Sequence, residues 1–531
     1  SNKNVSSLDI LSQLEFEIFG NSMSTDHDCL PHSPSNELAV VSNFSGPIQF
    51  VAEDSILSPL PFHYRGGFLG YLGYEVRHDT VQYLYHRHNS TPVAVNRSCD
   101  TTGDNSPVNE QHSPTVTDTP TAAFFLARNS LVFHHPTCMW YMISLVEHDK
   151  DLSQILSWMK TTKRHILDLR KQPESPLTNY IQNSKSLDNK SIQFTPYRSK
   201  EEYEAAIAQC HDFIRQGESY ELCLTNQLEA NLPYAISTWK LYKLLRKRNP
   251  APYSAFFRWR LRDSMDKELS ICCSSPERFM CVQRKQILPG APIVLQAEAK
   301  PIKGTARRVL PSNGVFRNDT EEAEDQQLAR ELEFSLKNRA ENLMIVDLLR
   351  NDMSRVCQVG SVHVTKLMAI ESFATVHQMV STIRGILATE AGQQKASTCI
   401  DLLRASFPGG SMTGAPKTRT MELLDELEQR VERGPYAGSL GYISVNGCMD
   451  MNIIIRSAVV TQDGENGQRI KIGAGGAITA LSEPKDEYEE MQLKAEAVVQ
   501  AVQDWVAAHS LPSLLLDSNT TLSVLTVDAR R

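Results

Sequence analysis

The spacing of apolar and polar side chains changes along the chain and predicts its elements. In residues 200–217 apolar side chains recur every three to four positions, Ser199 precedes the run and Gly217 ends it. This pattern is typical of an amphipathic helix. The same criteria predict long helices at 321–351 and 484–508 and strands at 122–127, 139–146, 220–230, 437–446, 452–461 and 469–473. Because strands and helices are intermixed without a regular βαβ rhythm, we expect an α+β fold.

Some segments lack such a pattern. Residues 87–121 are rich in Ser, Thr, Asn and Pro, with few large apolar side chains, and predict a disordered insertion. Residues 171–193 are also polar and are interpreted as a linker. We therefore expect an N-terminal region at 1–170 that contains the insertion, a second region at 194–508 and a tail at 509–531.

Composition and charge narrow the class of protein. The 531 residues are 41% hydrophobic and 22% charged, which is ordinary for a globular protein. At about 150 residues per domain, the length predicts three or four domains. The formal charge of −8 argues against a nucleic-acid partner bound through bulk positive charge, but leaves an anionic small-molecule substrate open. No apolar run approaches the roughly 18 residues of a membrane helix, so we expect no membrane partner.

The 11 cysteines are scattered and form no C-x-x-C pair. This usage predicts reduced thiols in an intracellular compartment, the cytoplasm or a plastid stroma. The sequence contains no cluster of Cys and His residues with the spacing of zinc ligands, so no zinc site is expected.

Several carboxylates are candidates for metal binding. Glu487 and Glu490 are three apart and project from one helix face, with Lys494 four positions further on. Two carboxylates on one face suit Mg²⁺, although a solvated acidic face with an ion pair to Lys494 has the same spacing. Glu341 begins a strongly apolar run and needs a partner if buried, for which Arg350 and a metal are the candidates.

Two further side chains are candidates for proton transfer or nucleophilic attack. Glu277 follows a strand-like run and is a candidate general acid. Lys303 stands between Ile302 and Gly304, in a segment of small or rigid residues that favours partial burial. Burial would lower its pKa and make it a nucleophile or base, whereas most lysines are simply solvated.

Two glycine-rich stretches are candidates for backbone contact with a ligand. Residues 407–419 fail the P-loop pattern because Pro416 stands before Lys417, but an anion cradle leading into a helix at 417–428 remains possible. Residues 471–478 lack the G-x-G-x-x-G spacing, so we reject a dinucleotide site there. Close approach of the backbone to a ligand is the functional alternative.

Eight strings occur in a fixed order: SSPERF, PIKGT, ENLMIVDLLRND, ASFPGGSMTGAPKTR, YAGSLGYIS, IIIRSAVV, GAGGAI and EYEEMQLKA. Together they resemble the chorismate-binding enzyme family, which includes anthranilate synthase component I and the isochorismate, salicylate and aminodeoxychorismate synthases. The match covers 195–505, and FHYRGGFLGYLGYE at 62–75 is similar to the family's N-terminal region. The resemblance implies one large α+β unit with two halves around a cleft, in place of several domains.

Lys303 in PIKGT is similar to the lysine of the aminodeoxychorismate synthase branch, whereas anthranilate synthases usually have Ala there. That branch implies Mg²⁺-dependent replacement of the 4-hydroxyl of chorismate by ammonia, for para-aminobenzoate and folate biosynthesis. Anthranilate synthase component I is the main alternative, and a non-catalytic subunit with the same fold is an alternative of another class. Glu221 stands where water-adding relatives have a lysine, which argues against an isochorismate or salicylate synthase.

The resemblance also implies roles for individual residues. Neutral Lys303 would attack C2 of the ring and form a covalent intermediate, and Glu277 would protonate the departing hydroxyl. The implied Mg²⁺ ligands are Glu341, Glu487 and Glu490, and the implied substrate shell is Arg456, Tyr436, Lys494, Thr413, Gly475, Gly476, Gly304 and Thr305. Two positions depart from the family pattern. Many relatives have His where this chain has Gln378, and here His377 precedes that position. Some relatives have a carboxylate where this chain has Asn338.

The implied reaction needs a source of ammonia. No cysteine lies in the G-x-C-x-G-x-Q context of a glutamine amidotransferase. We therefore expect a glutaminase in a separate chain or in an upstream fused domain, and a first residue that is Ser rather than Met favours the fused form. The short string that marks tryptophan-inhibited relatives was not found, so feedback inhibition by tryptophan is not expected.

Overall fold

The computed structural model describes residues 8, 38–43, 49–52, 60–80, 119–146, 151–169, 192–260, 267–309, 319–373, 376–389, 396–463 and 467–509. The predicted insertion, linker and tail lie outside these ranges except for a few residues at their ends. Within the described part, no helix has the length and apolarity needed to cross a membrane. The nine cysteines found there form no disulfide, as the sequence predicted.

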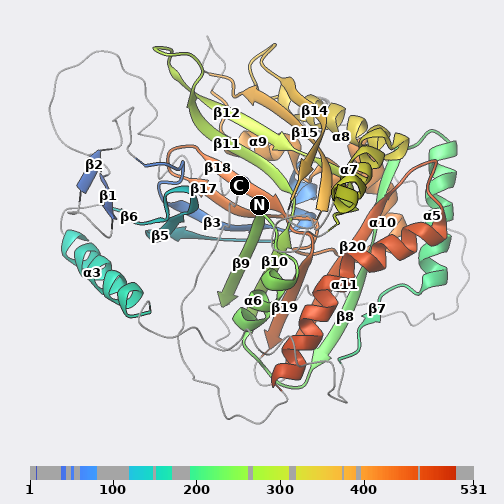
Figure 1. Ribbon diagram of the computed structural model, residues 1–531, viewed down its shortest axis with the longest axis horizontal. Coiled ribbons are helices and arrows are strands. Elements are labelled where there is room, and N and C mark those ends of the chain that lie inside the picture. Colours follow the sequence, from blue (N-terminus) through green and yellow to red (C-terminus); the bar gives the residue numbers. More distant parts are fainter. Residues whose placement is uncertain are drawn as a thin grey trace, which may run out of the picture.

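Two large antiparallel sheets form the body of the protein, so the predicted α+β class is confirmed (Figure 1). The described residues place seven strands in one sheet: β7 (Thr195–Pro196), β8 (Glu221–Leu232), β9 (Tyr253–Arg260), β10 (Lys267–Ser275), β16 (Gly414–Ala415), β19 (Ser457–Asp463) and β20 (Gln468–Ile478). They place nine in the other: β3 (Gly67–Leu72), β4 (Ala122–Ala127), β11 (Arg278–Gln286), β12 (Ile293–Lys300), β13 (Ile302–Arg307), β14 (His363–Ser372), β15 (Val376–Ile386), β17 (Ser439–Ser444) and β18 (Met449–Ile453).

A smaller sheet and a helix lie at the left of the view in Figure 1. The sheet consists of β1 (Leu38–Asn43), β2 (Gln49–Ala52), β5 (Asn129–His134) and β6 (Met139–Leu145), and the helix is α3 (Leu152–Leu169). Met142 of β6 and Ile155 of α3 are buried in one small apolar cluster. Because β3 and β4 belong to the nine-stranded sheet, the N-terminal part of the chain contributes directly to that sheet.

Helices cover the sheets with their apolar faces. Helices α5 (Lys200–Arg215), α6 (Thr238–Arg248) and α11 (Pro484–His509) pack on the seven-stranded sheet, where Ile207, Leu241 and Val498 are fully buried. The other helices are α7 (Asp319–Phe334), α8 (Leu336–Ser354), α9 (Cys399–Ser406) and α10 (Lys417–Leu427). Figure 1 shows α7 and α8 beside β14 and β15. Burial of these apolar stripes is the main favourable contribution to folding.

The structure corrects two predicted elements. The run at 321–351 is two helices, because Ser335 interrupts it and its hydroxyl caps the first turn of α8. The run at 452–461 is divided between β18 and β19, which belong to different sheets. The chain changes sheet at Ile454–Arg456, and Arg456 adopts a left-handed φ of 53°. Neither break carries the Gly or Pro that usually marks one.

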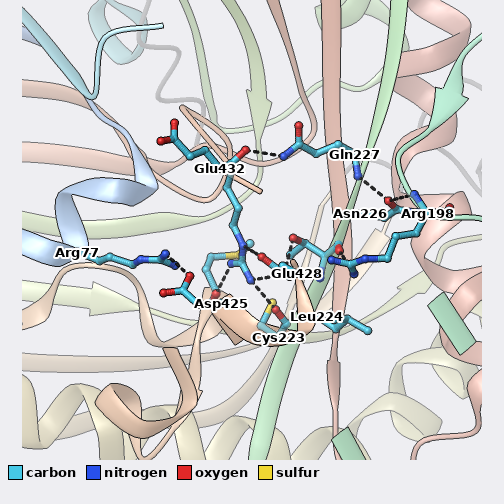
Figure 2. A network of polar contacts seen from close by, with 12 residues as sticks. Arg77, Arg198, Cys223, Leu224, Asn226, Gln227, Asp425, Glu428 and Glu432 are labelled. Atoms are coloured by element: carbon cyan, nitrogen blue, oxygen red, sulfur yellow. Dashed lines mark hydrogen bonds and ion pairs between the residues drawn. The ribbon is translucent and has the colours of Figure 1, made fainter. Parts of the chain in front are cut away.

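A buried polar network fastens the segment after α10 to β8 (Figure 2). Glu428 accepts hydrogen bonds from the backbone and hydroxyl of Thr225, at 2.9 and 2.8 Å. Arg433 donates to Glu428 and to the carbonyls of Cys223 and Met412, at 2.9 and 2.8 Å. Both charged side chains are buried, so each needs the other. The network fixes β8 and the segment that leads to Tyr436.

Candidate active site

Lys303 lies on β13 between two carboxylates. Its ammonium nitrogen is 2.9 Å from Oε1 of Glu221, the first residue of β8, and 3.9 Å from Oε2 of Glu341 on α8. The lysine side chain is 10% exposed and that of Glu221 is fully buried. The partial burial expected from the sequence is therefore confirmed.

The protonation state of Lys303 differs from the expectation. Burial lowers the pKa of Lys303, but the charges of Glu221 and Glu341 outweigh burial and raise it above its ordinary value. The sequence considered burial alone and so expected the pKa of Lys303 to fall, whereas the two neighbouring carboxylates reverse the direction of the change. Oε2 of Glu221 is buried and has no hydrogen-bond partner among the described residues, so the carboxylate can accept a proton.

Glu277 lies at the turn between β10 and β11 and is almost completely buried. Burial raises its pKa to about 7, against an opposing hydrogen bond from Ser411 and the charge of Lys303. The hydroxyl of Ser411 donates to Oε1 of Glu277 at 2.9 Å. A carboxyl with a pKa near neutrality suits a general acid, as the sequence predicted for this residue. Both residues line a small cavity with Gly410 and Leu349.

Glu487 and Glu490 project from the first turns of α11, as their spacing predicted. Glu487 is buried and accepts hydrogen bonds from Lys337 and from the hydroxyl of Ser482, both at 2.7 Å. Glu490 pairs with Lys494 at 2.8 Å, which is the ion pair expected from the i,i+4 spacing. Lys494 also donates to the carbonyl of Gly475 at 2.9 Å and so ties α11 to β20.

Glu341 projects from α8 toward Lys303, and the charge of Glu487 on α11 also acts on it. Burial raises the pKa of Glu341, Lys303 opposes that change, and the charges of Glu221 and Glu487 add to it. Arg350 was one predicted partner of Glu341 and does not serve, because it lies on an exposed part of α8 and pairs with Asp347 at 2.8 Å. The buried carboxylate is compensated by Lys303 instead.

The donor set of Glu341, Glu487 and Glu490 fits a hard cation by its chemistry, since carboxylate oxygens are the ligands that Mg²⁺ prefers. The ammonium of Lys337 is already held at one of them. Across the described ranges, no group of three or more His, Cys, Asp or Glu side chains converges into a direct metal cage. A cation that keeps several of its waters fits such a spread set best.

Gly476 of β20 leaves room for the side chains of Glu487 and Lys494. A Cβ atom added there would lie 3.1 Å from Oε2 of Glu487 and 3.4 Å from Nζ of Lys494. Any side chain at this position would therefore crowd the carboxylate. Gly475 is required for a different reason, because a Cβ atom there would lie 2.3 Å from the carbonyl oxygen of Leu224 on β8.

Arg456 is a partly buried cation with no ion-pair partner among the described residues. Burial lowers its pKa, and Tyr436 and the charge of Glu490 oppose the change. Tyr436 is also buried, and its ring lies 2.2 Å from where a Cβ atom of Gly473 would stand. A desolvated guanidinium without a carboxylate partner is suited to bind an anionic ligand through its planar fork.

Other predicted shell residues have different surroundings. The hydroxyl of Thr413 is buried and donates within its own loop, to the carbonyls of Gly409 and Gly410 at 3.4 and 3.3 Å. Gly304 has a φ of 84° and lies against Asn338. Thr305 is exposed and pairs in register with Gln378. Among the described residues, neither Thr413 nor Thr305 forms a hydrogen bond to the carboxylates, so their roles in binding stay predictions.

His377, which precedes Gln378 on β15, contacts groups other than the lysine and the carboxylates of the candidate site. Nδ1 of His377 lies 2.8 Å from the hydroxyl of Ser372, and Nε2 lies 3.1 Å from Asp325. Asp325 accepts from Arg308 at 2.8 Å. These contacts hold the end of β13 against β15 and α7, which is a structural role.

Sequence reasoning missed three side chains at the site. Ser411 and Ser482 orient Glu277 and Glu487, and nothing in their local sequence distinguishes them from loop serines. Lys337 carried a signal, because it stands four residues before Glu341 on the same helix and therefore on the same face.

Comparison with known proteins agrees with this arrangement. A family model described as chorismate binding enzyme matches residues 49–500. The chain is 40% identical over 474 residues to a protein of Oryza sativa subsp. japonica named "Probable aminodeoxychorismate synthase, chloroplastic", covering 86% of this chain and 45% of that protein. It is 36% identical over 364 residues to "Aminodeoxychorismate synthase component 1" of Escherichia coli (strain K12), covering 68% of this chain and 69% of that one. The chain thus spans less than half the length of the rice protein.

A solved structure shows the same fold. The crystal structure of anthranilate synthase component I from Streptococcus pneumoniae TIGR4 superimposes with a TM-score of 0.57 at 25% sequence identity. The superposition covers 94% of this chain and 99% of that one, so the similarity extends through both large sheets.

Proposed function

The chain belongs to the chorismate-binding enzyme family, and on that premise we propose that it is the synthase part of an aminodeoxychorismate synthase. The proposed reaction replaces the 4-hydroxyl of chorismate by ammonia and gives 4-amino-4-deoxychorismate, for para-aminobenzoate and folate biosynthesis. The observation that carries the proposal is Lys303, held 2.9 Å from Glu221 at the point where the two large sheets meet α8. The names of the rice and Escherichia coli relatives support it.

The first step activates the nucleophile. Lys303 is an ammonium at rest, so it must lose a proton before attack, and Glu221 is the acceptor within hydrogen-bond distance. The neutral amine then forms a bond from Nζ to C2 of the ring, and the double bonds shift toward C4. Splitting one difficult displacement into two steps is the contribution of covalent catalysis.

Glu277 acts at the other end of the ring. Its carboxyl, with a pKa of about 7, transfers a proton to the 4-hydroxyl as the C4–O bond breaks, so that the hydroxyl leaves as water. Ammonia then adds at C4, the double bonds shift back, and the bond from C2 to Lys303 breaks. Proton return from Glu221 to Lys303, and transfer of one proton from the added nitrogen to the Glu277 carboxylate, restore the enzyme.

The remaining residues would position the dianionic substrate. Glu341, Glu487 and Glu490 would hold Mg²⁺, which would offset the charge of the ring carboxylate and orient it. The guanidinium of Arg456, beside Tyr436, would hold the enolpyruvyl carboxylate. Lys494 and the backbone at Gly475 and Gly476 would border the ring carboxylate, because they lie against Glu487 and Glu490.

We also propose that ammonia comes from a glutamine amidotransferase, either fused or separate. The words "component 1" in the name of the Escherichia coli relative support a division of labour between components. Reduced cysteines support a reducing compartment, the cytoplasm or a plastid stroma, and the rice relative carries the word chloroplastic in its name.

A product assay tests the proposal. The purified chain is incubated with chorismate, ammonium and Mg²⁺, and the product is separated by liquid chromatography. We expect 4-amino-4-deoxychorismate, which releases pyruvate only after a lyase is added, and loss of product with Lys303→Ala. Pyruvate and fluorescent anthranilate formed without lyase would identify an anthranilate synthase instead, and no turnover of chorismate would indicate a non-catalytic subunit.

A further inference from the structure

Lys337 lies within the carboxylate cluster although its sequence position gives it no obvious catalytic role. It stands in the first turn of α8, and its Nζ donates to Oε1 of Glu487 at 2.7 Å. The Lys337 side chain is 38% exposed, whereas that of Glu487 is 3% exposed. A lysine on a flexible four-carbon stem therefore reaches from the protein surface to a buried carboxylate.

The ammonium contacts Glu487 and also lies within the electrostatic influence of Glu341 and Glu490. Burial lowers the pKa of Lys337, but the hydrogen bond to Glu487 and the charges of Glu487, Glu341 and Glu490 outweigh burial and raise it. These acids come from two helices, α8 and α11. Lys494 and Lys303 also lie near the cluster, and each has its own carboxylate partner, Glu490 and Glu221 respectively. The charge of Arg456 acts on Glu490 as well.

We infer that Lys337 is a built-in cation that competes with Mg²⁺ for Glu487, so that the lysine leaves this carboxylate when the metal binds. The inference rests on the proposed function, because it takes the metal site as its premise. Lys337 holds Oε1 of Glu487 at 2.7 Å, so a metal bound to this carboxylate would stand close to the ammonium, and two positive charges at so short a distance repel each other.

The surroundings permit this exchange. Lys337 is partly exposed and can turn its charge toward water at little cost. The hydroxyl of Ser482 donates to the same Oε1 of Glu487 at 2.7 Å, so this oxygen keeps one donor when the lysine leaves. The lysine thus compensates a buried carboxylate that would be costly to leave alone, and lowers the affinity for metal in return.

Calorimetric titration with MgCl₂ at constant ionic strength tests the inference. We compare the wild-type chain with Lys337→Met, which removes the charge, and Lys337→Gln, which keeps a donor. The matched control is Lys485→Met on α11, which makes the same charge change but removes only an exposed pair with Glu489 at 3.9 Å. We expect the two Lys337 variants to bind Mg²⁺ about tenfold more tightly than wild type, and Lys485→Met to bind as wild type does.

Thermal unfolding with and without MgCl₂ gives a second readout. The Lys337 variants should unfold at lower temperature than wild type in the absence of divalent cations, and saturating Mg²⁺ should remove most of that difference. If the Lys337 variants unfold at a lower temperature than wild type by the same amount with and without Mg²⁺, the contact is an ordinary ion pair and the inference is overturned. Equal Mg²⁺ affinities in wild type and variants would overturn it while leaving the metal site standing. If neither wild type nor any variant binds Mg²⁺, the proposed metal site and the inference are both disproved.

Discussion

The ammonium of Lys303 lies 2.9 Å from the carboxylate of Glu221, and this pair joins the two large sheets of the protein. Lys303 belongs to β13 in the nine-stranded sheet and Glu221 to β8 in the seven-stranded sheet, 82 residues apart in sequence. The proposed nucleophile and the group that takes its proton therefore come from different halves of the fold. Their separation depends on how the sheets pack.

Replacing Glu221 tests its role as proton acceptor. Glu221→Gln keeps the shape and a polar contact but removes the basic oxygen, so we expect kcat to fall about 10²- to 10⁴-fold. The KM for chorismate should change little, because Glu221 contacts Lys303 and is not proposed to bind substrate. Steady-state kinetics with ammonium measure both parameters. Glu218→Gln, which alters an exposed pair with Arg419, is the matched control, and a Glu221→Gln enzyme as fast as this control would contradict the assignment.

Glu277 predicts how activity depends on pH. The general acid must be protonated, and burial raises its pKa from 4.5 to about 7, so kcat/KM should fall as pH rises above about 7. Glu277→Gln should lower kcat strongly and remove this fall. Rates measured from pH 6 to 9, roughly one unit below and two above the pKa, give the profile. If the Glu277→Gln enzyme has the same pH profile as wild type, a group other than Glu277 is titrating.

The same raised pKa has a consequence for stability. The folded protein holds the Glu277 proton more tightly than the unfolded chain, so this stabilising contribution is fully present below pH 4.5 and is lost as pH rises through about 7. Glu277→Gln does not titrate and escapes the loss. We therefore expect the variant to gain free energy of unfolding relative to wild type between these pH values, measured by urea denaturation. If the difference in free energy of unfolding between Glu277→Gln and wild type is constant across this pH range, Glu277 does not take up a proton on folding.

Arg456 should govern substrate affinity. Charge-assisted hydrogen bonds are worth about 1.5–3 kcal/mol, so Arg456→Gln should raise the KM for chorismate by about 10- to 100-fold. Arg456→Lys keeps the charge without the planar fork and should recover only part of this loss. Arg260→Gln, on an exposed arginine of β9, is the control. Unchanged KM in Arg456→Gln would place the enolpyruvyl carboxylate elsewhere.

The buried pair of Arg433 and Glu428 should contribute strongly to stability. Arg433→Met leaves Glu428 buried without its cation, and such a loss typically costs about 3–5 kcal/mol of unfolding free energy. Arg350→Met removes an arginine from an exposed pair with Asp347 and should change stability little. Chemical denaturation compares the two variants with wild type. Equal stability of Arg433→Met and Arg350→Met would contradict a structural role for the network in Figure 2.

Local patterns in the sequence identified the regular elements and much of the site. The apolar spacing after Ser199 predicted α5, whose start the structure confirms with a capping box from Ser199 and Glu202. The spacing of Glu487, Glu490 and Lys494 placed all three on one face of α11, because the helical repeat fixes which side chains are neighbours. These features depend on residues close in sequence, so the sequence contains the information needed to predict them.

Only the tertiary structure decided the charge of Lys303 and the environment of Lys337. The neighbours Ile302 and Gly304 correctly predicted burial of Lys303, but the direction of its pKa change depends on Glu221 and Glu341, which come from β8 and α8. Likewise, the contact between Lys337 and Glu487 joins residues 150 apart. Electrostatic effects fall off with distance in space and not along the chain, so local sequence determines which groups can ionise and the packing of the sheets and helices determines which of them do.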